Sequence, residues 1–168
     1  LGDVYKRQGQ KHGTTQARSD EQAQTIQKSQ TMRKSLSKIF EDAAKECGVN
    51  TCLYARIKEA NYLLDYVKEY PVMLRLFQEP IYETNLTNRR RRRTTLYFLD
   101  ALGKPEPDTQ TEAAPIADRM EQMAFSFIDN LRRNGIEVQV ESLQGVVEKL
   151  DALAAGVEAK LVLTYNVC

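Results

Sequence analysis

The sequence predicts an α+β domain, and three observations carry that prediction. Two stretches, at 36–47 and 116–131, repeat apolar residues with the 3.6-residue period of an amphipathic helix. Four others show the apolar runs or the two-residue alternation of strands, at 72–77, 94–99, 136–141 and 157–166. The predicted order is therefore helix, two strands, helix, two strands. Because alternating strands bury one face, we expect a mainly antiparallel sheet with the helices packed on one face.

The first helix is predicted from Leu36 to Cys47, and Gly48 follows it as the left-handed residue that commonly ends a helix. The next stretch is ambiguous, because residues 51–55 would also pair as a strand while the apolar spacing favours a helix at about 56–68. Pro71 disfavours a helical conformation at the residue before it and opens the strand at 72–77.

A polar excursion from Gln78 to Arg93 separates the first two predicted strands, which we interpret as an extended hairpin. Residues 103–114 contain two prolines and mostly polar neighbours, so they are predicted to be an exposed connection. Pro115 then occupies the first turn of the long helix, which ends in two arginines and the glycine at 135.

The third strand is expected to continue past a kink at Gly145 as far as Leu150, with residues 152–156 forming the turn into the last strand. The predicted core combines the inner faces of these helices and strands: Leu36, Phe40, Leu74, Leu76, Leu96, Phe98, Met120, Phe127, Leu131, Leu161 and Leu163.

The N-terminal segment 1–31 is set apart from the predicted domain at 32–168. Residues 3–8, DVYKRQ, are what GAT GTG TAT AAG AGA CAG encodes, which resembles the end of a transposase-delivered sequencing adaptor. The following residues to Thr31 are polar and rich in glutamine, so we expect a disordered tail that is not native. We take Met32, just before the first helix, as the natural start.

The amino-acid composition argues against most kinds of catalytic or metal site. The net charge is only +1, and no stretch approaches the roughly 18 apolar residues of a membrane span, so we expect a cytosolic product. Three cysteines and one histidine, His12, are too few for the usual zinc sites, and no glycine-rich nucleotide motif or nucleophile motif occurs. Cys47 is expected in the core. We predict no enzymatic activity, catalytic residue, metal, cofactor or small-molecule substrate.

Five consecutive arginines are the one feature that departs from this background: Arg89, Arg90, Arg91, Arg92 and Arg93. Their guanidinium groups would bind phosphates and give salt-dependent affinity for nucleic acid. Alternatively, they form a solvated charge run that blocks aggregation at a sheet edge. A third interpretation is a basic loop that faces an acidic partner subunit or the lumen of an assembly. In each case we expect them to be mostly exposed, on the connection between the first two strands or at the mouth of the second.

Several stretches resemble small proteins encoded in the tail-assembly regions of phages and prophages of gut Bacteroidetes. The resemblance is carried by Cys47–Asn50, Leu53-Tyr54, Ala60-Asn61, Tyr70–Leu74, Leu96–Asp100, Ala114–Ile116 and Ala155–Thr164. The broader architecture is similar to the tail-completion, or tail-terminator, proteins of long-tailed phages. That group runs helix, three strands, helix, strand, whereas two strands are predicted here after the long helix.

This resemblance implies a non-enzymatic virion assembly subunit that forms a homo-oligomeric ring by lateral contact of its sheets and helices. Its partners would be neighbouring tail or neck proteins, and it would act in the cytoplasm of the bacterial host and then in the virion. The rival hypothesis from another class is a small nucleic-acid-binding module that uses Arg89–Arg93.

Overall fold

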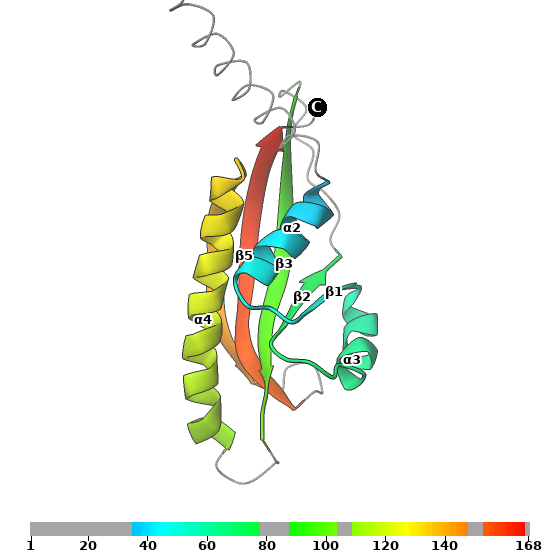
Figure 1. Ribbon diagram of the computed structural model, residues 1–168, viewed down its shortest axis with the longest axis vertical. Coiled ribbons are helices and arrows are strands. Elements are labelled where there is room, and N and C mark those ends of the chain that lie inside the picture. Colours follow the sequence, from blue (N-terminus) through cyan, green and yellow to red (C-terminus); the bar gives the residue numbers. More distant parts are fainter. Residues whose placement is uncertain (1–34, 78–87, 104–108, 148–152, 167–168) are drawn as a thin grey trace, which may run out of the picture. The chain divides into compact units, whose positions relative to one another are not determined.

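The computed structural model describes residues 35–77, 88–103, 109–147 and 153–166. The chain divides into two units, Leu1–Lys34 and Ser35–Cys168, and every described residue belongs to the second (Figure 1). Its described elements are α2 (Leu36–Glu46), β1 (Thr51–Ala55), α3 (Ile57–Asp65), β2 (Val72–Leu76), β3 (Arg89–Ala101), α4 (Thr109–Arg133), β4 (Glu137–Val147) and β5 (Ala154–Asn166). The segment 1–31, predicted to be a scar and a tail, lies outside the described residues.

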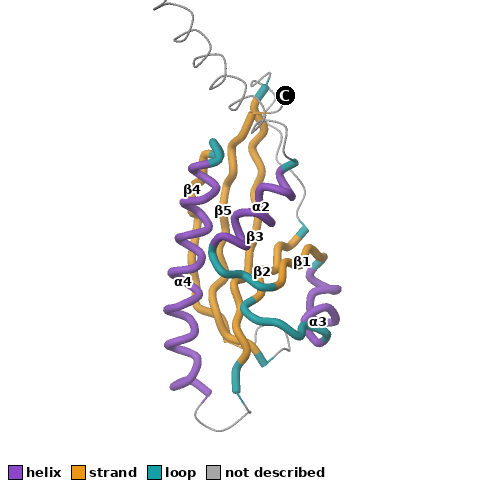
Figure 2. Tube along the Cα trace, in the orientation of Figure 1, coloured by secondary structure: helices purple, strands orange, loops and turns teal. Residues whose placement is uncertain are grey.

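The described strands form one sheet in the order β1-β2-β3-β5-β4 (Figure 2). β1 and β2 run parallel, whereas β2 with β3, β3 with β5 and β5 with β4 run antiparallel. The α+β class is confirmed, but the predicted order of elements is wrong, because β1 and α3 precede β2. Parallel neighbours need a crossover between them, and α3 provides it. The helix expected at about 56–68 is therefore present, and residues 51–55 form the strand that the sequence left open.

Helices cover both faces of the sheet, so the prediction that they pack on one face is wrong. We call the two faces the α4 face, on which α2 and α4 lie, and the α3 face. Met73 of β2 packs with α2 and α4, whereas its neighbours Val72 and Leu74 pack with Ala60 and Leu64 of α3. Since successive side chains of a strand point to opposite faces, an unbroken apolar strand such as β2 requires cover on both sides.

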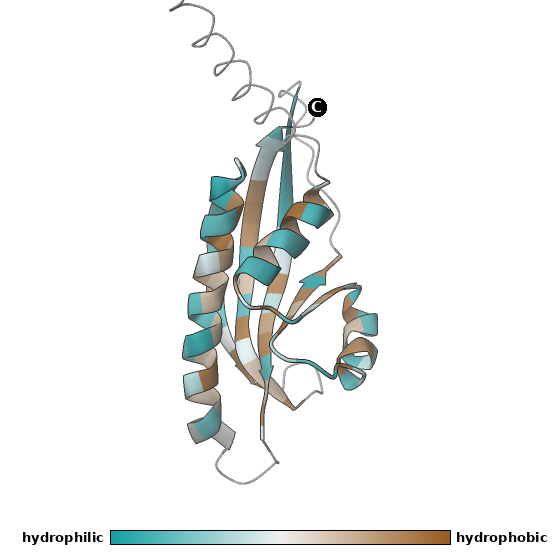
Figure 3. Cartoon of the chain, viewed as in Figure 1, coloured by the Kyte–Doolittle hydropathy of each residue, from teal (hydrophilic) through white to brown (hydrophobic). Residues whose placement is uncertain are grey.

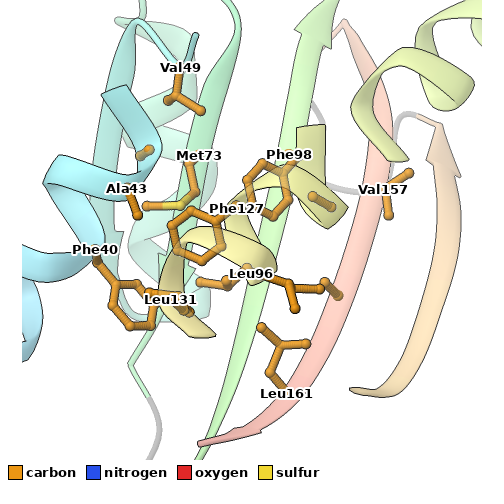
Figure 4. Packing of buried hydrophobic residues seen from close by; sticks show 14 of the residues in the cluster. Phe40, Ala43, Val49, Met73, Leu96, Phe98, Phe127, Leu131, Val157 and Leu161 are labelled. Carbon is orange, nitrogen blue, oxygen red and sulfur yellow. The ribbon is translucent and has the colours of Figure 1, made fainter. Parts of the chain in front are cut away.

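The larger core lies on the α4 face around Phe127 (Figure 4). Its ring meets Phe40 of α2 edge-on at 5.3 Å between centroids and Phe98 of β3 at 5.5 Å. Such contacts add to the stabilisation that burial alone provides. All the predicted core residues are buried except Leu36, which is half-buried because it lies in the first turn of α2. Cys47, expected in the core, is half-buried at its margin.

Capping groups fix the helix ends where the sequence predicted them. The Ser35 hydroxyl accepts a hydrogen bond from the Lys38 N–H at the start of α2. Gly48 and Gly135, with φ of 86° and 79°, follow α2 and α4 in the left-handed conformation that glycine adopts without strain.

Two predicted boundaries are wrong. α4 begins at Thr109, so residues 109–114 are helical rather than an exposed connection, and Pro115 lies inside the helix. The early start is stabilised by packing, because Ala113 is buried against Leu102 and Ala155. β5 begins at Ala154, so residues 154–156 belong to a strand rather than to a turn. β4 continues past Gly145 to Val147, as expected, and residues 148–150 lie outside the described residues.

Candidate functional site

The arginine run is part of a strand and not of the connection before it. β3 begins at Arg89, and all five arginines pair with β5, from Arg89 opposite Asn166 to Arg93 opposite Val162. Of the two predicted positions, the connection between the first two strands is therefore wrong, and the mouth of the second strand is confirmed. Their exposure is mixed, because Arg91 and Arg92 are half-buried while the other three are exposed. Figure 3 shows this end of β3 as hydrophilic, in contrast to the apolar middle of the strand.

On the α3 face, the arginines form ion pairs across the neighbouring strand. Arg89 pairs with Glu137, and Arg93 donates from Nε and NH2 to Oε1 of Glu141 at 3.1 and 2.7 Å. Both glutamates belong to β4, which lies on the far side of β5 from β3. These charges compensate one another, and exposed pairs of this kind contribute only about 0–1 kcal/mol each.

On the α4 face, the positive charge of Arg92 acts on Arg75 of β2, a residue that was not predicted as part of the site. The Arg75 side chain is only 6% exposed, and its guanidinium carbon lies 4.4 Å from the ring centroid of Phe40 and 5.1 Å from that of Tyr54. Burial, together with the positive charge of Arg92, lowers the pKa of Arg75. A charged residue inside an apolar strand was the available signal.

Large apolar side chains are exposed near both edges of the sheet. Beside β1, the ring centroids of Tyr54 and Phe77 lie 5.8 Å apart, and those of Tyr62 in α3 and Tyr66 just after it lie 4.8 Å apart. All four rings are half exposed or more. At the other edge, Val140 and Val147 of β4 are also exposed. Clustered apolar side chains on a surface are one mark of a site that contacts another protein.

A buried polar group lies near the middle of the α3 face. Tyr97 of β3 stands opposite Glu158 of β5, and its hydroxyl hydrogen-bonds to that carboxylate. Burial, with the charge and hydrogen bond of Glu158, raises the pKa of Tyr97 to about 12. The Glu158 carboxylate also pairs with Lys160 at 3.1 Å. These contacts satisfy a buried carboxylate, so they need no substrate to explain them.

The described part of the chain offers little else for chemistry. Burial raises the pKa of the free thiols of Cys47 and Cys52, which makes them less nucleophilic at neutral pH. Among the described residues, no three His, Cys, Asp or Glu side chains lie close enough to hold a metal ion. A shallow depression at the junction of α4 and β4 is lined by Arg132 and residues 135–138, and the charged side chains in this lining are those of Arg132 and Glu137. The lack of enzymatic activity stays a prediction.

Comparison with known proteins leaves the chain without an assigned family. No family model matches the sequence, and no curated protein matches it. None of the helices in the described part of the chain is long and apolar enough to cross a membrane.

Proposed function

We propose that the protein is a non-enzymatic virion assembly subunit, a tail-completion or head-tail joining protein that acts as a ring of identical copies. The observation that carries the proposal is the position of the exposed apolar side chains at opposite edges of one sheet. Tyr54 and Phe77 lie beside the β1 edge, and Val140 and Val147 lie on the β4 edge. Neighbouring tail or neck proteins would bind the ring.

Under this proposal, the β1 edge of one copy binds the β4 edge of a second copy. Within the described residues, β1 pairs only with β2 and β4 only with β5, so both strands leave their outer backbone groups unpaired. Two different surfaces that bind each other make a head-to-tail contact, and such a contact closes into a ring when the rotation between copies allows it. One contact of this kind covers both apolar edges at once.

The outer strands carry features that restrict this pairing. β4 has an irregularity between Val140 and Ser142, where its register with β5 shifts, and its charged residues Glu137 and Glu141 are held by β3. Bulges and charges on an edge strand oppose indiscriminate strand addition. We infer that the contact relies on side chains as much as on backbone pairing, which favours a defined ring over an open aggregate.

The nucleic-acid alternative draws less support from the same geometry. A protein that uses arginines to bind phosphates needs their charges free, whereas Arg89 and Arg93 each hold a glutamate. A strand also directs consecutive arginines to opposite faces, so the run does not present five charges to one partner.

The experiment compares the full chain with a variant in which Arg89–Arg93 are all glutamine. Light scattering should give the wild type the mass of a closed oligomer, and DNA retention should be weak and unchanged by the five substitutions. The proposal fails if the wild type is monomeric at micromolar concentration. It also fails if the wild type retains DNA with a steep salt dependence that the glutamine variant loses while its oligomer mass stays normal.

A further inference from the structure

We propose that Arg75 and Arg92, together with the hydroxyl of Thr94, form a binding site for a doubly charged oxyanion such as inorganic phosphate. The site lies on the α4 face, beside the outer part of α2. It adjoins the β1 edge through Tyr54, whose ring lies 5.1 Å from the Arg75 guanidinium. Arg75, Arg92 and Thr94 themselves play no part in the proposed function, so either proposal can fail alone.

The sheet register brings these side chains together. Arg75 of β2 stands directly opposite Leu96 of β3. Thr94 and Arg92 precede Leu96 by two and four residues in the same strand, so their side chains point to the same face as Arg75. Phe40 of α2 covers the Arg75 guanidinium from above, which places that group between the helix and the sheet.

Three buried polar atoms of this group lack partners. Nε of Arg75, Nε of Arg92 and Oγ1 of Thr94 are each buried and have no hydrogen-bond partner in the part of the chain that the structure describes. Thr94 is 1% exposed and Arg75 is 6% exposed. Buried donors are nearly always satisfied in native proteins, so three unsatisfied atoms in one place indicate that a ligand completes the group.

The charges of the two arginines are likewise unbalanced. Within the described residues, neither Arg75 nor Arg92 lies within ion-pair distance of a carboxylate, whereas Arg89 and Arg93 on the same strand each hold a glutamate. The rings of Phe40 and Tyr54 offset part of the cost of burying Arg75, but they do not neutralise its charge. An anion would satisfy both the charge and the donors.

The chemistry of the group selects the class of anion. Two guanidinium groups present parallel N–H donors that match the oxygens of a phosphate, and the threonine hydroxyl adds a further donor. Two positive charges favour a dianion over a chloride or an acetate. Arg92 is half-buried and Tyr54 is exposed, so the group borders the surface of the protein.

The test is a titration of the full chain with inorganic phosphate at constant ionic strength, followed by calorimetry and by thermal unfolding. We expect saturable binding and a rise in Tm that sodium chloride and sodium acetate do not reproduce. Arg92→Gln should weaken phosphate binding about tenfold or more, since it removes a charge-assisted contact. The matched control is Arg93→Gln, which removes the same charge from the opposite face and should leave the affinity within about twofold.

Arg75 is tested with a conservative variant, because its guanidinium is buried against Phe40 and Arg75→Gln would also change stability. Arg75→Lys retains the charge but loses the planar fork, so it should fold and still bind phosphate about tenfold more weakly. The proposal is overturned if the wild type shows no saturable response to phosphate. Equal losses in Arg92→Gln and Arg93→Gln would also overturn it, because they would mean that only net charge matters.

Discussion

At Gly156 the backbone of β5 approaches β3 so closely that no other residue fits. A Cβ added there would lie 1.9 Å from the carbonyl oxygen of Phe98. We predict that Gly156→Ala lowers the free energy of unfolding by at least about 2 kcal/mol, because either backbone must shift. Gly145 of β4 is the control, since an added Cβ meets nothing within 4 Å and Gly145→Ala should change stability by less than about 1 kcal/mol. Urea unfolding measures both, and equal effects would contradict the packing described here.

Phe127 is the residue on which the α4-face core depends most. It is 0% exposed, whereas Phe125, two residues earlier in α4, is 49% exposed. We predict that Phe127→Ala costs about 3–5 kcal/mol of unfolding free energy, because it leaves a cavity between Phe40 and Phe98. Phe125→Ala should stay within about 0.5 kcal/mol in the same urea titration. A cost below about 1 kcal/mol at Phe127 would show that α4 buries a different face.

The buried hydroxyl of Tyr97 makes the free energy of unfolding depend on pH in the alkaline range. Its pKa is about 12 in the folded chain and about 10 when unfolded, so the folded state holds the proton more tightly. The stability that this difference contributes is present below pH 10 and is lost as the pH rises toward 12. By pH 11 the advantage of the wild type over Tyr97→Phe should have shrunk by about 1.4 kcal/mol relative to pH 9. Urea unfolding of both proteins at the two pH values tests this, and a constant difference would refute it.

Among the elements, those with a clear period were predictable and those defined by distant partners were not. The apolar stripe of α4 and the alternation of apolar and polar residues in β5 are visible in the sequence, because a helix or strand face must be apolar wherever it is buried. β1 is five residues long and its pairing with β2 depends on the crossover through α3, which no local pattern encodes. The helical start of α4 ahead of Pro115 depends on the packing of Ala113 against Leu102 and Ala155. Both of these residues lie outside α4, so the local sequence does not reveal the contact.

The candidate site also depends on distant partners, as Arg89–Arg93 at the start of β3 show. Five arginines have low strand propensity and repel one another, so the sequence favoured a loop. Glu137 and Glu141 lie more than 40 residues away and oppose that repulsion only after β4 and β5 have assembled. The run itself was identifiable as unusual from the sequence. The burial of Arg75 was not, because only the folded structure shows that Phe40 packs on its guanidinium group.

At the scale of the whole molecule, the exposed edges of the sheet support the proposal that the protein assembles. Its middle strands are covered on the α4 face by α2 and α4, while the apolar side chains left exposed at β1 and β4 lie at opposite edges. Tyr54 and Phe77 expose apolar rings to water, and the proposed contact with a second copy would cover them. We therefore propose that the β1 edge of one copy binds the β4 edge of the next.

A mixture of two edge variants tests this contact between copies. One variant, Tyr54→Ser with Phe77→Ser, disables the β1 edge, and the other, Val140→Lys with Val147→Lys, disables the β4 edge. We predict by light scattering that each variant alone is monomeric and that an equimolar mixture forms a dimer, because each partner supplies the edge that the other lacks. Phe125→Ser, which removes an equally exposed ring from α4, should assemble like the wild type. A mixture that stays monomeric, or a single-edge variant with the mass of the wild-type oligomer, would contradict the claim.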